Sequence, residues 1–238
     1  MIRFSEQRCY NKNNSRRMTL TSHHKIFAVG DIHGCRQKLE ILLGQLPYDR
    51  ERDLLVFLGD YINRGPESRG VIDLLCDLKR SGGHLVTLMG NHEYLLLEYQ
   101  RSVDPALIPL LRKLQIEPTL ASYGLNDLSR LQHLTGLPEK HRQFLAGLRP
   151  SYETDTHIFV HAGLYPGLPL AEQEPSTLTE IRDVFLSSTC DFGKIVVFGH
   201  TTFQTPLLSR TKIGIDTGAV YGNMLTALEL PAMVFHHA

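Results

Sequence analysis

The sequence has no excess of either charge and no long apolar run. Its 25 basic and 25 acidic residues cancel, so no overall field draws the chain to nucleic acid or to an acidic membrane surface. No apolar stretch approaches the roughly 20 residues of a membrane span, and the N-terminus lacks the apolar core of a secretory signal. We therefore expect partners recognised through a local site, with no nucleic acid or membrane among them.

Cysteine is also scarce. The four residues Cys9, Cys35, Cys76 and Cys190 lie far apart and form no CxxC pair. This spacing predicts neither a zinc knuckle nor a disulfide framework. It agrees best with a reducing compartment, and we expect a cytoplasmic protein.

The composition of the sequence changes near residue 25. Residues 1–24 are polar and mostly basic, which predicts a flexible basic tail, although an arginine-rich, acid-poor leader is also typical of a transit peptide. Residues 25–238 contain no internal repeat and no Pro/Gly-rich linker. With 42% hydrophobic residues in the chain, we expect them to form a single domain.

Short apolar runs that end in glycine predict buried strands. Three such runs occupy residues 26–29, 54–58 and 85–89, and their nearly continuous apolar character is typical of strands covered on both faces. A helical pattern from Glu67 to Arg80 lies between the second and third runs. The succession of strand, loop, helix and strand predicts an α/β sheet that begins with parallel strands.

Helical patterns and then further strands follow. Residues 93–148 hold helix-period stretches and no convincing strand, which predicts a helical insertion beside the sheet. The stretches cover residues 94–101, 105–114 and 138–148. Strand patterns return at residues 152–153, 157–160, 195–198, 212–215, 225–230 and 233–235, the first two as a hairpin. The expected fold class is α/β, with a central mixed β-sandwich flanked by helices.

Potential metal ligands stand in the loops after the predicted strands. They are Asp31, His33, Asp60, Asn91, His161 and His200. A single aspartate at a strand end is more often a turn or helix-capping residue. A succession of such loops instead predicts one metal site, because open α/β sheets gather their sites at the carboxyl ends of strands.

These loops resemble the motifs of one family. They read GDIHG at residues 30–34, GDYINRG at 59–65, GNHE at 90–93, HAG at 161–163 and GH at 199–200. In that order they resemble the metallophosphoesterases of the phosphoprotein phosphatase type. Residues 119–124 and 161–173 are similar to the bacterial serine/threonine phosphatase branch. The resemblance spans residues 25–222 and implies the calcineurin-like metallophosphoesterase fold.

The resemblance implies two metal ions. Asp31, His33 and a bridging Asp60 would hold the first, and Asp60, Asn91, His161 and His200 the second. A mixed set of oxygen and imidazole ligands suits Mn²⁺, Fe or Zn²⁺ better than Ca²⁺, and we expect two divalent ions, Mn²⁺ first among them. Two such cations lower the pKa of a bridging water, so the implied nucleophile is a hydroxide between them.

The resemblance also implies residues that meet the substrate. Arg64 and Arg182, the latter in a helix expected over residues 176–186, would bind phosphate oxygens. His92 would protonate the leaving oxygen and would not bind metal. The family usually has aspartate where this chain has Asn63, and a neutral amide would hold His92 less readily as imidazolium. The asparagine is either a tolerated natural variant or a deliberate substitution.

The predicted activity is hydrolysis of phosphate monoesters. By resemblance, the leading substrates are phosphoserine and phosphothreonine in proteins, so the expected partner is a phosphorylated protein or a small phosphoester. One alternative is hydrolysis of dinucleoside polyphosphates such as diadenosine tetraphosphate, against which Glu93 stands because those relatives more often carry aspartate there. Another is a phosphate-binding pseudophosphatase in which Asn63 suppresses turnover.

Overall fold

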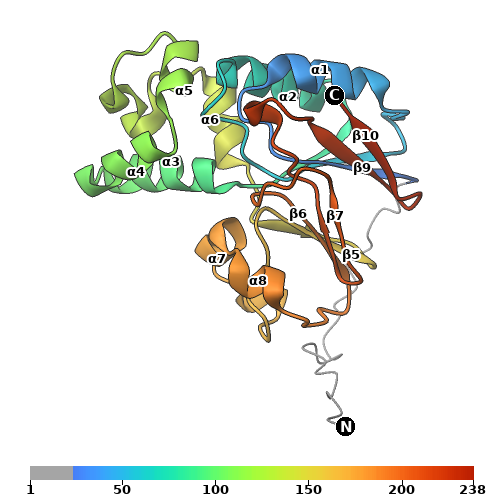
Figure 1. The fold of residues 1–238 in the computed structure, drawn as a ribbon. Helices are drawn as coiled ribbons and strands as arrows, with labels where there is room; N and C mark the ends of the chain where they lie inside the picture. The colour runs from blue at the N-terminus through green and yellow to red at the C-terminus, as the bar shows by residue number, and fades with distance from the viewer. Residues whose placement is uncertain (1–23) are drawn as a thin grey trace.

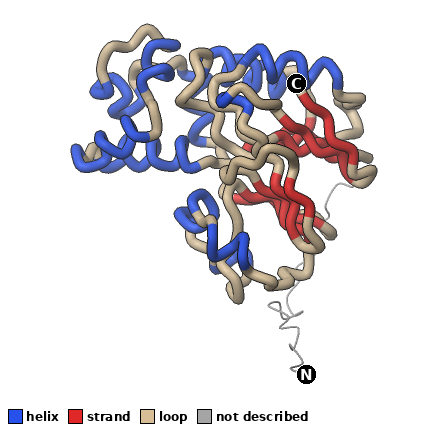
Figure 2. Tube along the Cα trace, in the orientation of Figure 1, coloured by secondary structure: helices blue, strands red, loops and turns tan. Residues whose placement is uncertain are grey.

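The chain forms two sheets of five strands each. The computed structural model describes residues 24–238, so residues 1–23 of the expected basic tail lie outside the described part of the chain. The two sheets lie against each other, with helices on the outside (Figures 1 and 2). The predicted α/β class with a central mixed sandwich is therefore confirmed.

The first sheet has the strand order β10-β9-β1-β2-β3. Its strands are β1 (Ile26–Val29), β2 (Leu54–Phe57), β3 (His84–Thr87), β9 (Thr226–Leu230) and β10 (Val234–His237). Strands β1, β2 and β3 pair in parallel, whereas β9 runs antiparallel to β1 and to β10. Because the three parallel strands end at one edge of the sheet, the loops that follow them meet there.

The second sheet has the order β4-β5-β6-β8-β7. Its strands are β4 (Ser151–Glu153), β5 (His157–Val160), β6 (Ile195–Phe198), β7 (Leu207–Leu208) and β8 (Lys212–Gly214). Strands β5, β6 and β8 are parallel, and the two edge strands are antiparallel to their neighbours. The hairpin of β4 and β5 confirms the one predicted.

The strands build several cores because successive side chains point to opposite faces. Phe27 and Val29 of β1 join the apolar cluster under α1 (Arg36–Gln45) and α2 (Ser68–Arg80). Ala28 joins a second cluster, which contains Phe159 and Val197 of the other sheet. A third cluster lies between the second sheet and the helices α7 (Pro175–Glu180) and α8 (Asp183–Ser187). The layers are thus helix, sheet, sheet and helix.

Helices fill the chain between β3 and β4 and gather at one end of the first sheet (Figure 1). They are α3 (Asn91–Ser102), η1 (Pro105–Leu107), α4 (Ile108–Lys113), α5 (Glu117–Ser122), η2 (Leu128–Leu134) and α6 (Glu139–Ala146). Short 3₁₀ helices also occur at η3 (Leu170–Glu172) and η4 (Ala219–Tyr221). Helix α3 begins three residues before its predicted start, because its polar first turn has no apolar period to reveal it.

The helix predicted over residues 176–186 is wrong. Helix α7 ends at Glu180 and α8 starts at Asp183, so Arg182 lies at the break, with φ −131° and ψ −96°. In a continuous helix the carbonyl of Leu178 would accept the N–H of Arg182. It accepts the N–H of Ala162 instead, at 2.8 Å. A contact with a distant loop therefore interrupts a locally helical pattern.

The described residues bear on the membrane spans and disulfides considered from the sequence. None of the helices in residues 24–238 is long and apolar enough to cross a membrane. The thiols of Cys35 and Cys76 are free, but Cys190 is disulfide-bonded. The cysteine spacing predicted no disulfide framework, and the bonded Cys190 contradicts that prediction at this one position.

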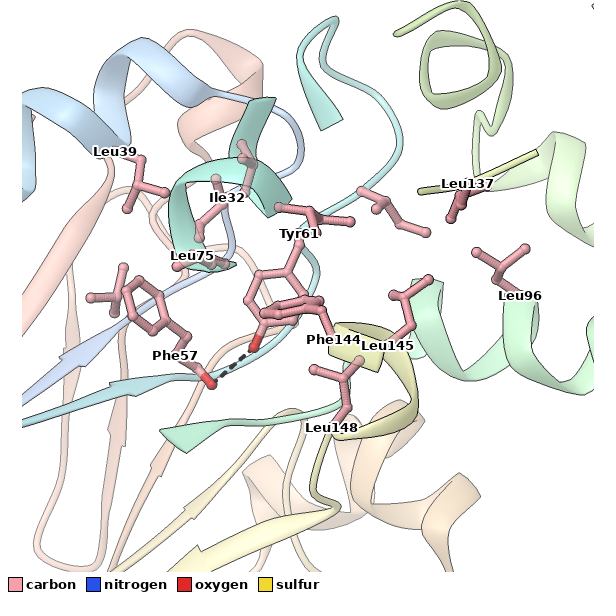
Figure 3. Close-up of a cluster of buried hydrophobic side chains, with 14 of the residues drawn as sticks. Ile32, Leu39, Phe57, Tyr61, Leu75, Leu96, Leu137, Phe144, Leu145 and Leu148 are labelled. Carbon is pink, nitrogen blue, oxygen red and sulfur yellow. Dashed lines mark hydrogen bonds between the residues drawn. The ribbon is translucent and has the colours of Figure 1, made fainter. Parts of the chain in front are cut away.

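Tyr61 joins the first sheet to the helices that follow β3. Its side chain is fully buried, and its ring meets Phe144 of α6 edge to face with centroids 5.3 Å apart (Figure 3). Its hydroxyl donates to the carbonyl of Leu88 at 2.8 Å. Since Tyr61 follows Asp60 directly, its packing also restrains the loop after β2.

We expect Tyr61→Ala to lower the free energy of unfolding by about 3–5 kcal/mol, the cost of deleting a large buried aromatic ring. Tyr61→Phe keeps the ring and should cost about 1–3 kcal/mol for the unpaired Leu88 carbonyl. Urea unfolding would measure both, with Leu110→Ala, at a residue 47% exposed, as the control. Equal losses for the two tyrosine variants would show that the ring contact with Phe144 contributes nothing.

Candidate metal centre

The loops that end β1, β2, β3, β5 and β6 meet at one edge of the sandwich. They bring together two groups of potential ligands, each with donor atoms within 4.8 Å of one another. The groups are His33, Asp60 and His92, and Asp60, His161 and His200. Asp60 belongs to both groups. Its Oδ2 lies 3.3 Å from Nε2 of His33 and its Oδ1 lies 3.5 Å from Nε2 of His161, an arrangement that suits a bridging carboxylate.

The backbone orients two of the histidines for ligation. Nδ1 of His33 donates to the carbonyl of Ile62 at 2.9 Å, and Nδ1 of His161 donates to that of Leu58 at 2.9 Å. A neutral ring that donates from Nδ1 keeps a lone pair on Nε2. Each ring therefore presents Nε2 to the site, as metal-binding histidines do when a second group fixes their tautomer.

Asn91 lies beside the second group. Its Oδ1 is 3.2 Å from Nε2 of His161 and 3.0 Å from Nδ1 of His200. Nε2 of His200 is buried and has no hydrogen-bond partner among residues 24–238. The structure thus brings together all four residues of the second predicted ligand set.

Asp31 stands slightly apart from these groups. Both of its carboxylate oxygens accept the backbone N–H of His200, each at 3.1 Å. This approach needs glycine at position 199, because a Cβ there would lie 2.2 Å from Oδ1 of Asp31. Asp31 lies in the same buried region, and its role as a ligand stays a prediction.

The electrostatics of this region favour a bound cation. Burial raises the pKa of Asp31, and the charges of Asp216 and Asp60 raise it further. Burial also raises the pKa of Asp60. Burial, and then the charge of Arg64, lowers the pKa of His33 to about 3. Burial likewise lowers the pKa of His161 to about 3. Crowded carboxylates beside neutral imidazoles form a donor set that fits divalent metal ions.

The loops hold several site residues in the left-handed backbone region. The φ angles are 45° at His33, 53° at Asp60, 70° at Asn63, 65° at Arg64 and 62° at His200. Each such conformation costs on the order of 1–3 kcal/mol in a residue other than glycine. The surrounding contacts must therefore determine these loops strongly.

Glu93 provides much of that restraint. It is fully buried, and its carboxylate accepts the backbone N–H groups of Asp60 at 2.9 Å, Tyr61 at 2.9 Å, Ile62 at 3.1 Å and Gly90 at 3.2 Å. This role of Glu93 was not predicted from the sequence. The position was recognisable, because Glu93 is the third residue of a helix capped by Gly90, where a capping box places glutamate.

His92 is paired with Asn63. The ring is fully buried, its Nδ1 lies 2.9 Å from Nδ2 of Asn63, and its Nε2 lies 3.8 Å from Oδ2 of Asp60. An amide nitrogen only donates, so Nδ1 accepts and the proton of the neutral ring is on Nε2. Protonated Nε2 cannot bind metal, which separates His92 from the ligands although it lies in the first group. Burial, and then the charge of His33, lowers its pKa.

Both predicted arginines lie near this centre. Arg64 is half-buried, contacts Nε2 of His33 through Nη1, and has its guanidinium 5.5 Å from the centre of the Tyr221 ring. Arg182 is exposed and donates to Oγ1 of Thr201 at 3.4 Å. The charge of each lowers the pKa of His161, which places both within electrostatic reach of the same ligands.

Asp216 is a buried acid near the site that was not predicted from the sequence. It accepts a hydrogen bond from Thr202 Oγ1 at 2.8 Å and one from the N–H of Gly218 at 2.9 Å. Because it follows the strand that includes Ile213, its position at a strand end was the same signal that indicated Asp31 and Asp60.

A cavity of about 480 Å³ lies next to these residues. It is lined by Thr202, Phe203, Gln204, Thr205, Thr217, Gly218, Tyr221 and Asn223. The guanidinium of Arg64 lies over the ring of Tyr221, and Thr202 is two residues from His200. The cavity therefore adjoins the candidate metal centre.

Residues 24–203 match the model of the calcineurin-like phosphoesterase family. The chain is 29% identical over 237 residues to the asymmetrical bis(5'-nucleosyl)-tetraphosphatase PrpE of Halalkalibacterium halodurans, which covers 87% of this chain and 90% of that one. It is 30% identical over 215 residues to serine/threonine-protein phosphatase 1 of Salmonella typhimurium, with coverages of 84% and 89%.

Solved structures of phosphatases have a fold similar to that of this chain. A crystal structure of a protein provisionally named a diadenosine tetraphosphatase superposes with a TM-score of 0.68 and 27% identity, over 92% of this chain and 94% of that one. A cold-active protein tyrosine phosphatase variant shares the fold, with a TM-score of 0.63 at 18% identity. The chain therefore belongs to the calcineurin-like phosphoesterase family and is a metal-dependent hydrolase of phosphoesters, of the phosphoprotein phosphatase type.

Proposed function

We propose that this enzyme hydrolyses dinucleoside tetraphosphates, by cleaving a phosphoanhydride bond at a centre of two divalent metal ions. The observation that carries the proposal is the pairing of His92 with the neutral amide of Asn63. The cavity beside Arg64 supports it. The two named tetraphosphatases among the similar proteins are consistent with it.

We assign the site residues the roles that the family resemblance implies, with two sets of metal ligands and two phosphate-binding arginines. Asp31, His33 and Asp60 would hold one ion, and Asp60, Asn91, His161 and His200 the other, with Mn²⁺ as the favoured ion. Bound ions of this kind act as Lewis acids on phosphate oxygens and lower the pKa of a bound water. Arg64 and Arg182 would bind phosphate oxygens that the ions leave free.

The leaving group decides between the two substrate classes. Neutral His92 presents Nε2–H, which is a good hydrogen-bond donor but a poor source of a whole proton. A nucleotide that leaves a phosphoanhydride is a phosphate, whose second pKa is about 6, so it departs as an anion. A serine alkoxide needs the proton in the transition state. The pair of Asn63 and His92 therefore favours the anhydride.

The cavity suits the nucleoside part of such a substrate. Phe203 and Tyr221 offer aromatic rings for a base, while Gln204 and Asn223 offer polar groups for its edges and for the ribose. Its size lies within the range of about 300–1,000 Å³ of small-molecule sites. Lys38 donates to the carbonyl of Ala219 at 2.9 Å and so holds the loop that carries Tyr221.

The contacts of Glu93 in the structure are compatible with a dinucleotide substrate. From the sequence alone, glutamate at position 93 stands against a dinucleotide substrate. The side chain is fully buried and its carboxylate is engaged by four backbone N–H groups, so it is not free to contact a substrate. Glutamate at this position supports the loop after β2 through these hydrogen bonds.

A phosphoprotein is the second candidate substrate, and similarity to the Salmonella phosphatase favours it. With Asn63 at the position of the usual carboxylate, such an enzyme would release a serine alkoxide without an effective proton donor. A pseudophosphatase is the weaker alternative, because the ligands and Arg64 that turnover needs converge on one site.

We expect the purified protein to bind two Mn²⁺ ions per chain, because Asp60 faces histidines on both sides. Asp60→Ala should lose both ions, since it removes a ligand common to the two groups. Elemental analysis after loading would measure this, with Asp155→Ala on the surface as the control. A stoichiometry of one, unchanged in Asp60→Ala, would rule out the shared centre.

We expect wild-type enzyme to prefer diadenosine tetraphosphate over a phosphoserine peptide. Asn63→Asp should raise hydrolysis of the peptide by about 10-fold, part of the 10²–10⁴-fold that acid–base catalysis typically supplies. The dinucleotide and p-nitrophenyl phosphate should change little, because their leaving groups need no proton. The ratio kcat/KM would be measured for all three at fixed Mn²⁺. A wild-type preference for the peptide would refute the proposed substrate class.

A further inference from the structure

Thr119, on helix α5 of the helical insertion, reaches the candidate metal centre through Asn63. We propose that Thr119 is a positioning residue whose hydroxyl fixes the orientation of the Asn63 amide and thereby the tautomer of His92. The inference rests on the role given to His92 in the proposed function. Thr119 itself would contact neither metal nor phosphate.

The contacts form one buried chain. Oγ1 of Thr119 donates to Oδ1 of Asn63 at 2.9 Å, and Nδ2 of Asn63 lies 2.9 Å from Nδ1 of His92. Oγ1 of Thr119 also accepts the backbone N–H of Asn63 at 2.8 Å and lies 2.9 Å from Oγ of Ser68. All four side chains are at most 2% exposed, so water does not compete for these bonds.

Counting hydrogens gives the direction of each bond. The single hydroxyl hydrogen of Thr119 goes to Asn63 Oδ1, so the hydroxyl of Ser68 donates to Thr119. Nδ2 of Asn63 then points at Nδ1 of His92, which must accept, and the ring carries its proton on Nε2. In this arrangement the hydroxyl hydrogens of Thr119 and Ser68 both have an acceptor. Nε2 of His92 is buried and has no hydrogen-bond partner among residues 24–238 in either orientation of the amide, so it does not distinguish the two.

The opposite amide orientation leaves one hydrogen unpaired. With Nδ2 turned to Thr119, the threonine would have to donate to Ser68. The hydroxyl hydrogen of Ser68 would then have no acceptor, since the other partner of its Oγ within residues 24–238 is the N–H of Asn63. An unpaired buried polar group is unfavourable, so the network selects the orientation observed.

The helical insertion holds Thr119 in place. The N–H of Arg69 on α2 donates to Oγ of Ser122 at 3.2 Å, three residues after Thr119. Next to it, the hydroxyl of Tyr123 bonds to Nδ1 of His141 at 2.8 Å, and Nε2 of His141 bonds to Asp73 of α2 at 3.0 Å. Helix α5 is therefore attached to α2, the helix that also carries Ser68.

The decisive measurement is the tautomer of His92. In the metal-free protein at neutral pH, ¹⁵N NMR of the histidine rings should show His92 protonated on Nε2. Thr119→Val has nearly the same shape but no hydroxyl, which frees the amide to turn and accept from the ring. We expect the proton to move to Nδ1 in this variant, and Thr119→Ser should restore the Nε2 form.

Activity gives a second readout. Thr119→Val should lower kcat for diadenosine tetraphosphate by about 10²-fold, the typical cost of one lost transition-state donor, with KM and metal content unchanged. Thr119→Ser should recover most of this loss. Thr226→Val removes another buried threonine hydroxyl, bonded to Thr217 and His237, and is the matched control, for which we expect unchanged kcat.

Two results would overturn the inference: a wild-type ring protonated on Nδ1, or a Thr119→Val ring that keeps its proton on Nε2. If Thr119→Val does not fold, Thr119→Ala removes the same hydroxyl without the branched side chain and decides in its place. The tautomer is read without substrate, so a wrong substrate class would leave this result standing. The failures of the inference and of the proposed function are thus distinguishable.

Discussion

The buried carboxylate of Glu93 is the constraint on which the site depends. Its two oxygens hold the N–H groups of three consecutive residues after β2 and that of Gly90 after β3. The loop fixed in this way accepts the N–H groups of Ile32 and His33 at the carbonyl of Asp60, at 3.1 and 2.8 Å. One side chain thereby sets the relative positions of the loops after β1, β2 and β3. The left-handed backbone of Asp60 is a consequence of this arrangement.

Charge is distributed unevenly across the site. Acidic groups are concentrated where the ligands meet, and burial raises the pKa of Asp31, Asp60 and Asp216. The position next to His92, in contrast, carries the neutral Asn63. In a buried site, an amide costs less to desolvate than a carboxylate, and it selects a neutral ring tautomer instead of an imidazolium. The candidate ligands and the pair of His92 and Asn63 therefore have different electrostatic characters.

Much of the fold, and the convergence of the candidate ligands, could be predicted because both depend on local patterns. Apolar runs that end in glycine marked β1, β2 and β3, and the polar residues after them are the candidate ligands that the structure brings together. What escaped prediction depends on contacts between distant parts of the chain. The break at Arg182 arises from a bond to the loop after β5, and the link from Thr119 to Asn63 spans 56 positions. No periodicity within a segment encodes such contacts.

The break between α7 and α8 has a mechanical consequence. The bond from Ala162 N–H to the Leu178 carbonyl starts at the residue after His161, and the carbonyl of His161 accepts the N–H of Gly199 at 2.7 Å. Backbone hydrogen bonds thus connect helix α7, the loop of His161 and the loop of His200. Arg182 lies directly after α7, at the break before α8. Because α7 is bonded to the loop of His161, we expect substitutions on the surface of this short helix to alter the spacing of the candidate ligands.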